Sequence, residues 1–154
     1  MLDVGCASAI DYSLFKGTGI RYIGLDITQK FLDYARHLNP EVDVRLASAI
    51  DLPFKDGEVD VVYMKSLVEH LHPDEWRKAI TEAWRVSAKK LILCFVLKPR
   101  EGEAEYNYRE EGYYENFLSR DELIDFLKKL RDARKVREIL SVGRHDLYVV
   151  EKID

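Results

Sequence analysis

Two short strand-forming runs near the amino terminus, the first of them followed by a turn of small residues, constrain the fold more than any other feature of this chain. The run Leu2–Val4 is followed by Gly5, and further small residues occupy positions 7–9. A second apolar run ends at Asp26. This order predicts two strands of an open sheet, in which the glycine permits a tight turn and the small residues let a ligand approach the backbone. The pattern indicates a nucleoside pocket, where the carboxylate of Asp26 accepts hydrogen bonds from both hydroxyls of a ribose.

Length, charge and cysteine content exclude several classes of protein. The 154 residues suit one domain, residues 1–154, that buries about two thirds of its unfolded surface. No apolar run approaches the roughly 20 residues that span a bilayer, and no signal peptide is recognisable, so we expect no membrane association. A net charge of −4 gives no general attraction to phosphate backbones, so we expect no nucleic acid and favour small molecules or proteins as partners, with a small molecule as the substrate. Cys6 and Cys94 lie in apolar segments of different strands, as is typical of reduced thiols in a cytoplasmic protein.

Alternating strand and helix signals predict an α/β fold. We expect strands at Leu2–Val4, Arg21–Leu25, Asp43–Ala47, Val59–Met64, Lys90–Leu97, Lys135–Val142 and Asp146–Glu151. We expect helices at Ser8–Phe15, Thr28–Leu38, Pro73–Val86 and Ser119–Leu130. Thr28 and Ser119 are the expected caps, the latter with Glu122 at capping-box spacing, and Pro73 suits a first turn. The last two strands are joined by a tight turn near Gly143 and must pair antiparallel, whereas helical crossovers make the other strands parallel. The predicted fold is a seven-stranded, mostly parallel Rossmann-like sheet with a C-terminal antiparallel hairpin strand and helices on both faces.

Three further blocks extend the pattern of the first two strands. Arg45–Asp60 is similar to the block "gDAxxLPFxDxxFD", and Val68–Leu71 is similar to the element "LEHL". Ala83–Val86 is similar to "EixRVLkpgG" before a fifth strand, although the glycines that follow are absent here. In this order, the blocks resemble the class I S-adenosylmethionine-dependent methyltransferases, and in particular those related to ubiquinone and menaquinone biosynthesis enzymes. The resemblance extends over nearly the whole chain and implies a methyltransferase whose acceptor the sequence does not identify.

The resemblance implies that S-adenosyl-L-methionine lies against the strand ends. Its methionine end would meet the first loop and Asp3, the latter through water or the ammonium, and its ribose would meet Asp26. The side chain of Ser48 and the backbone of Ala49 would face the adenine edge. The expected cofactor-binding residues are Asp3, Gly5, Cys6, Ala7, Asp26, Ile27, Ser48, Ala49 and Ile50, with Ile27 and Ile50 on the two faces of the adenine ring.

Two departures from the family pattern predict weaker cofactor binding than a complete motif gives. Ala9 replaces a usual glycine, and Ser48 stands where the family usually has an aspartate for the adenine amino group. A hydroxyl still forms a hydrogen bond, but without charge. Ordinary structural roles are the alternatives: Cys6 in simple packing, and Asp51 in a turn rather than as an adenine ligand.

His70 is the candidate general base. It follows the fourth strand, near the point where the strand order reverses, and an imidazole titrates near neutrality. Packing or a loop hydrogen bond is the alternative role. The neighbouring Glu69, His72 and Asp74 match no zinc spacing, so we expect no metal.

The segment between the fifth strand and the last helix is rich in tyrosine. In this fold it lies over the carboxyl ends of the strands, where substrate sits, and tyrosine offers an apolar face with a polar tip. The alternative is that these rings fill space beneath a long loop. The expected substrate-binding residues are Tyr106, Tyr108, Arg109, Tyr113 and Tyr114.

The amino terminus leaves the function open. Related methyltransferases place one or two helices before the first strand, and the printed sequence begins at that strand. We expect a shortened chain, an open pocket, or a homo-oligomer or partner subunit that covers the open side. The alternative function is a non-catalytic methyltransferase-like partner or regulatory protein. A nicotinamide-binding Rossmann protein fits the third block and the terminal hairpin badly.

Overall fold

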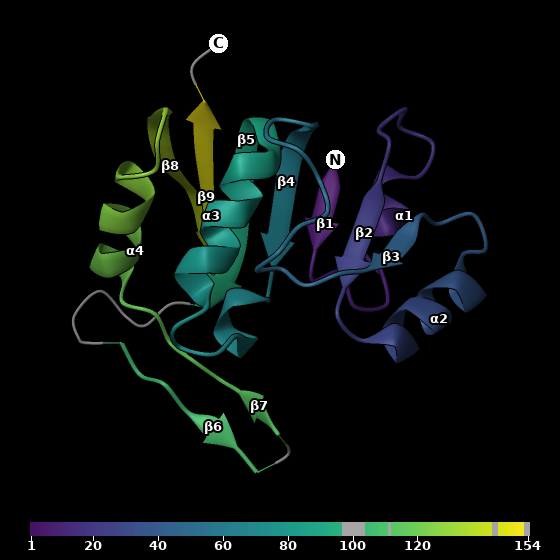
Figure 1. The fold of residues 1–154 in the computed structure, drawn as a ribbon, viewed down its shortest axis with the longest axis horizontal. Helices are drawn as coiled ribbons and strands as arrows, with labels where there is room; N and C mark the ends of the chain where they lie inside the picture. The colour runs from purple at the N-terminus through teal and green to yellow at the C-terminus, as the bar shows by residue number, and fades with distance from the viewer. Residues whose placement is uncertain (97–103, 111, 143–144, 153–154) are drawn as a thin grey trace.

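A seven-stranded sheet forms the centre of the protein in the computed structural model, which describes residues 1–96, 104–110, 112–142 and 145–152. The strand order is β3-β2-β1-β4-β5-β9-β8 (Figure 1). The strands of this sheet are β1 (Leu2–Val4), β2 (Ile23–Asp26), β3 (Val44–Leu46), β4 (Val59–Lys65), β5 (Ser87–Val96), β8 (Ala133–Val142) and β9 (His145–Lys152). The pairs β3–β2, β2–β1, β1–β4 and β4–β5 are parallel, whereas β9 pairs antiparallel with both β5 and β8. The predicted α/β fold is confirmed.

Helices pack on both faces of the sheet, and the longer ones each bury apolar residues along one side. The described helices are α1 (Tyr12–Phe15), α2 (Gln29–Leu38), η1 (Val68–His70), α3 (Trp76–Val86) and α4 (Arg120–Lys128). In α3, Trp76, Ala79, Ile80 and Ala83 recur at helical spacing and are fully or almost fully buried. They join α4 in the larger apolar cluster on one face, and α1 and α2 form a smaller cluster on the other (Figure 1).

The topology directs the loops that matter for function to one edge of the sheet. β1 lies between β2 and β4, so the chain reverses its direction of winding between β3 and β4. Ligands of open parallel sheets bind at the carboxyl ends of the strands beside such a reversal. The turn after Val4, the carboxylate of Asp26 and the loop after Lys65 all lie at this edge.

Two helices begin later than the sequence predicts. Residues 7–11 form turns, because Ala7 and Ala9 have positive φ angles of 46° and 51° that a right-handed helix excludes, and α1 is only Tyr12–Phe15. Residues 73–75 also form a turn, closed by the hydrogen bond from the Glu75 N–H to the His72 carbonyl, so Pro73 precedes α3.

The predicted caps occupy the cap positions without capping through their side chains. Thr28 and Ser119 precede α2 and α4, but neither side chain makes a cap hydrogen bond. Glu122 pairs instead with Arg77 of α3, which replaces the predicted capping box by a contact between helices.

One element was not predicted: a short hairpin of β6 (Tyr108–Arg109) and β7 (Tyr113–Tyr114) that projects from the sheet edge (Figure 1). Its base is closed by two backbone hydrogen bonds between Glu105 and Phe117, of 2.9 and 2.8 Å. We call residues 105–110 and 112–117 the tyrosine hairpin. Leu97, at the end of the predicted fifth strand, and the turn near Gly143 lie outside the described residues. Within the described ranges, no helix has the length and apolarity needed to cross a membrane.

Candidate functional site

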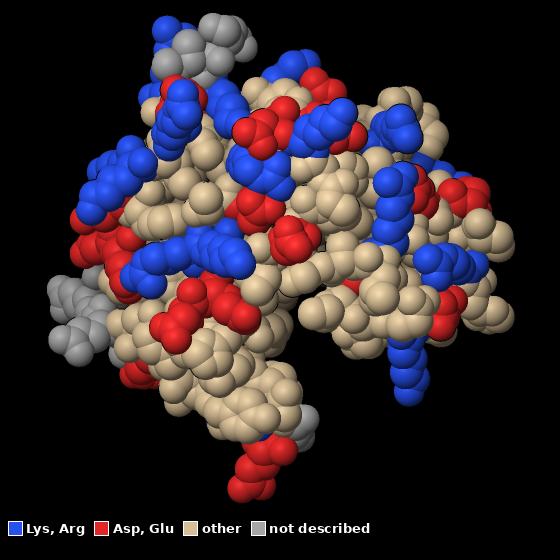
Figure 2. Space-filling model, viewed as in Figure 1, with Lys and Arg blue, Asp and Glu red and all other residues tan. Residues whose placement is uncertain are grey.

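A cavity of about 820 Å³ opens at the carboxyl ends of the strands. Its lining comes from the loops after β1, β2, β3 and β4 and from the tyrosine hairpin. In Figure 2 a notch separates the hairpin, at the bottom of the view, from the surface over α2 at the right. Among the predicted site residues, the cavity is lined by Gly5, Ala7, Asp26, Ile27, Ser48, Ala49, Ile50, His70, Tyr113 and Tyr114.

The turn after β1 brings backbone close to this cavity. Gly5 has φ of +79°, and a Cβ there would lie 2.9 Å from Leu67 Cδ1. The N–H groups of Gly5 and Cys6 both donate to the Leu25 carbonyl, at 2.8 and 2.9 Å. Only glycine accommodates this backbone conformation and this close approach together, so the turn is fixed against β2.

The Asp26 carboxylate is held in place by backbone on both sides. Oδ2 accepts a hydrogen bond from the Ala7 N–H at 2.9 Å, and Oδ1 accepts one from the Thr28 N–H at 2.8 Å. A carboxylate has about four acceptor positions. Each oxygen therefore keeps capacity for one hydroxyl of a ribose diol, which is the arrangement that the sequence predicts for this residue.

A short segment between β3 and the loop before β4, residues 47–50, forms one wall of the cavity. The Ala47 N–H donates to the Asp26 carbonyl at 3.0 Å, and the Asp51 N–H closes a turn on the Ser48 carbonyl at 3.2 Å. Ile27, 73% exposed, and Ile50 supply apolar surface to the same cavity. The donors, acceptors and apolar surface present here fit a nucleoside.

Further lining residues were missed from the sequence. They are Val4, Thr28, Phe31, Ala47, Ser66, Leu67, Leu71, Glu75 and Gly112. Ser66 and Leu67 follow β4 directly, so the rule that parallel strand ends meet at one edge could have found them. Phe31 had a weaker signal, since it lies one helical turn after Ile27.

Asp3 and Cys6 do not line this cavity. Asp3 is 4% exposed, and the Tyr22 hydroxyl donates to its Oδ2 at 2.5 Å. Burial is the main cause that raises the pKa of Asp3, to about 6. Cys6 is buried in the smaller apolar cluster, where burial raises the pKa of its thiol.

Replacing Asp3 with asparagine is expected to stabilise the protein at neutral pH. The folded pKa of about 6 lies above the ordinary value of 3.8, so the native carboxyl binds protons more tightly than the unfolded one. Stability is therefore lost as the pH rises through this window, by up to about 3 kcal/mol. An asparagine oxygen still accepts from Tyr22 but carries no charge.

Urea unfolding from pH 4 to pH 7 measures this effect. The advantage of Asp3→Asn over the wild type should be small at pH 4 and grow toward pH 7. The exposed Asp33 on α2 supplies the control, Asp33→Asn. Parallel stability curves for Asp3→Asn and the wild type would show that Asp3 carries no such penalty.

His70 lines the cavity beside the tyrosine hairpin. Its Nδ1 is 2.8 Å from the Tyr114 carbonyl oxygen, and its ring meets the Tyr113 ring edge-on with centroids 5.8 Å apart. A carbonyl only accepts, so Nδ1 carries the proton and Nε2 of the neutral ring is an acceptor.

Within the described residues, no three His, Cys, Asp or Glu side chains gather closely enough to hold a metal.

Two further hydrogen bonds join the tyrosine hairpin to η1. The Asn116 N–H donates to the Glu69 carbonyl at 2.8 Å, and Asn116 Nδ2 donates to the Leu71 carbonyl at 2.7 Å. Asn116 is 1% exposed. The hairpin is thus held over the cavity by backbone and side-chain bonds together.

Three of the predicted substrate residues lie outside the cavity lining. Tyr108 contacts the Tyr114 ring edge-on, with centroids 5.1 Å apart, and Arg109 pairs with Glu115. Tyr106 is 40% exposed. Tyr113 and Tyr114 are the members of the predicted set that reach the cavity.

Comparisons with known proteins agree with this geometry. A family model described as a methyltransferase domain matches residues 2–95. A ubiquinone biosynthesis O-methyltransferase from Thiobacillus denitrificans is 39% identical over 79 residues, covering 48% of this chain and 34% of that protein. The chain spans about a third of the length of the curated relatives it matches.

Solved structures share the fold. The PH0226 protein from Pyrococcus horikoshii has a TM-score of 0.79 and 19% identity, covering 99% of this chain and 81% of that one. The Burkholderia thailandensis 1,6-didemethyltoxoflavin-N1-methyltransferase, with bound 1,6-didemethyltoxoflavin and S-adenosylhomocysteine, has a TM-score of 0.74 and 16% identity, covering 99% and 70%. The predicted resemblance and the predicted cofactor, S-adenosylmethionine, are confirmed at the level of the family: the chain belongs to the methyltransferase domains.

Proposed function

We propose that this protein binds S-adenosylmethionine in the strand-end cavity and transfers its methyl group to a small-molecule acceptor. The observation that carries the proposal is a single cavity with two chemically different walls. One wall holds the Asp26 carboxylate and the 47–50 segment, and the other holds His70 and two tyrosines. A volume of about 820 Å³ is within the range of ligand pockets and suits a nucleoside with a small second molecule.

S-adenosylmethionine supplies an activated methyl group, so the protein mainly has to align the acceptor and exclude water. Asp26 orients the ribose, and the tyrosine hairpin covers the side where we place the acceptor. His70 donates through Nδ1 to Tyr114, which leaves Nε2 as the basic atom for an acceptor hydroxyl or amine. An acceptor that is already ionised needs no such base.

The partners in this proposal are small molecules, in a cytoplasmic setting. Both cysteines are free, as expected in a reducing compartment. On the face drawn in Figure 2, Lys and Arg side chains are intermixed with Asp and Glu, so no basic surface gathers there for nucleic acid.

Calorimetry of the full chain with S-adenosylmethionine and, separately, with NAD tests the proposal. Binding of the first and not the second supports it. Binding of neither supports the alternative, a non-catalytic methyltransferase-like partner. Ala7 and Ala9 favour that alternative. Both have positive φ angles, which glycine adopts at lower cost, so the turn that would meet the cofactor lacks glycine where its backbone suits glycine best.

Ser48→Asp is expected to tighten S-adenosylmethionine binding, about fivefold. Ser48 lines the cavity, and a carboxylate accepts a stronger hydrogen bond from the adenine amino group than a hydroxyl does. The matched control is Ser48→Asn, which has similar size without the charge. Equal or weaker binding in a folded Ser48→Asp variant would mean that this position does not face the adenine edge.

We also expect the surface beside the cavity to be covered by a second copy or by another subunit. Large apolar side chains are exposed in the turn before α1, on α1, directly after β2 and on α2: Ile10 74%, Leu14 68%, Ile27 73% and Phe31 47%. Light scattering across a concentration series should show masses above the 18.0 kDa of one chain. A constant monomer mass would exclude self-association and leave another subunit as the covering chain.

A further inference from the structure

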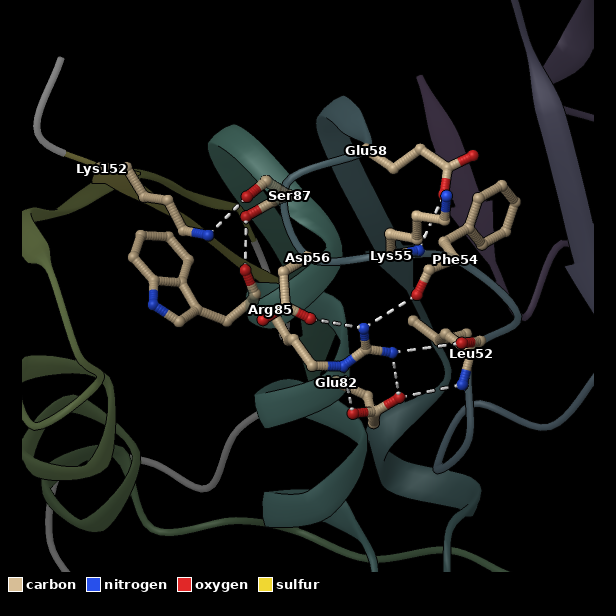
Figure 3. A network of polar contacts seen from close by, with 10 residues as sticks. Leu52, Phe54, Lys55, Asp56, Glu58, Glu82, Arg85, Ser87 and Lys152 are labelled. Atoms are coloured by element: carbon tan, nitrogen blue, oxygen red, sulfur yellow. Dashed lines mark hydrogen bonds and ion pairs between the residues drawn. The ribbon is translucent and has the colours of Figure 1, made fainter.

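An arginine outside the cavity fixes the loop that follows the 47–50 segment. Arg85, on the last turn of α3, directs its guanidinium into the loop between Leu52 and Asp56 (Figure 3). Nη1 donates to the Phe54 carbonyl at 2.8 Å and to Asp56 Oδ1 at 2.9 Å, and Nη2 donates to the Leu52 carbonyl at 3.2 Å. One side chain thus binds three points of the loop.

Glu82 completes the arrangement from the same helix. Its carboxylate accepts two hydrogen bonds from Arg85, at 2.7 and 2.8 Å, and Oε2 also accepts the Leu52 N–H at 3.0 Å. Both backbone polar groups of Leu52 are therefore bound by the Arg85–Glu82 pair (Figure 3). The pair is only partly exposed, at 30% and 17% of the two side chains, so its bonds are partly shielded from water.

The 47–50 segment has no helix or regular strand of its own to hold it. One end is fixed by the bond from the Ala47 N–H to the Asp26 carbonyl. The other end continues within two residues into Leu52, which is 3% exposed and bound by Arg85 and Glu82. The position of this cavity wall is therefore determined at one side by the ribose-binding strand end and at the other by Arg85.

We propose that Arg85 is a positioning residue for adenine recognition: together with Glu82 it sets the position of the 47–50 segment without touching the cofactor. The inference rests on the proposed function, because it needs the nucleoside in this cavity. It predicts that loss of Arg85 lowers the preference for adenine over another base. A general loss of stability would instead weaken the binding of ligands with either base equally.

The test compares two nucleoside ligands on the full chain by calorimetry, under conditions where circular dichroism shows the variants to be folded. The ligands are S-adenosylhomocysteine and its inosine analogue. The first carries the adenine amino group on the edge that faces the 47–50 segment, and the second carries an oxo group there. We expect Arg85→Met to lower S-adenosylhomocysteine affinity about tenfold, the loss of roughly one strong hydrogen bond. We also expect the preference for adenine over hypoxanthine to shrink.

Arg137→Met is the matched control, since Arg137 pairs with Glu151 on strands remote from the cavity. It should change neither the affinity nor the base preference. If Arg85→Met does not fold, Arg85→Lys keeps the charge beside Glu82 but not the planar fork, and should shift both quantities in the same direction.

The outcomes separate the two proposals. A folded Arg85 variant with wild-type affinity and wild-type base preference overturns this inference while leaving the proposed function intact. Equal losses for both ligands, with the preference unchanged, also overturn it, because they indicate a general structural role. A wild-type protein that binds neither ligand overturns the proposed function and this inference together.

Discussion

Replacing Asp26 with alanine is expected to weaken S-adenosylhomocysteine binding by at least about tenfold. The variant loses the carboxylate that would accept both ribose hydroxyls, and hydrogen bonds to a charged group contribute about 1.5 to 3 kcal/mol. It also leaves the N–H groups of Ala7 and Thr28 without their acceptor, which loosens the turn on each side of the cavity. Isothermal titration calorimetry of the folded variant measures the loss.

Asp51→Ala is the control for this experiment. Asp51 is an exposed acid close to the 47–50 segment but is not part of the cavity lining. Its replacement changes the net charge by the same amount as the replacement of Asp26. We expect its affinity to match the wild type. If Asp26→Ala also matches the wild type, Asp26 does not belong to the ribose site.

Of the substitutions described, Trp76→Ala is expected to lower the free energy of unfolding the most. Trp76 is 1% exposed at the start of α3, and its ring meets Phe126 of α4 edge-on with centroids 5.3 Å apart. Removing a buried tryptophan costs about 3 to 5 kcal/mol. Total stabilities of domains are about 5 to 15 kcal/mol, so the urea midpoint should fall steeply.

Tyr34→Ala provides a matched comparison, because it removes an aromatic ring that is 54% exposed on α2. A surface change of this kind is expected to stay within about 0.5 kcal/mol of the wild type. Equal urea midpoints for the two variants would show that the contact between α3 and α4 does not support the fold.

The sheet could be predicted from the sequence because its signals are local and strong. Val59–Met64 and Leu2–Val4 are rich in apolar and β-branched residues, each with one aspartate, and the structure places β4 and β1 there with small changes at the ends. The terminal strands pair antiparallel as predicted. Likewise, the cavity residues that follow a strand end, such as Asp26 and Ser48, lie where the rule for parallel sheets puts them.

The remaining features depend on contacts between distant residues. Asp3 follows the motif pattern, yet its side chain lies away from the cavity and binds Tyr22, which depends on the face of β1 from which it projects. The tyrosine hairpin has strands of only two residues, too short for a periodic signal. The bond that joins the hairpin to His70 spans 44 positions of the chain, and no local pattern encodes such a contact.

The tyrosine hairpin and the nucleoside side of the cavity are held by different sets of bonds. His70 and Asn116 join the hairpin to η1, whereas Asp26 and Arg85 hold the turns on the opposite wall. The paired backbone bonds between Glu105 and Phe117 also give the hairpin its own closed base. Under the proposed function, exchange of the hairpin between Glu105 and Phe117 would therefore change the side that meets the acceptor without changing the bonds that hold the proposed nucleoside side.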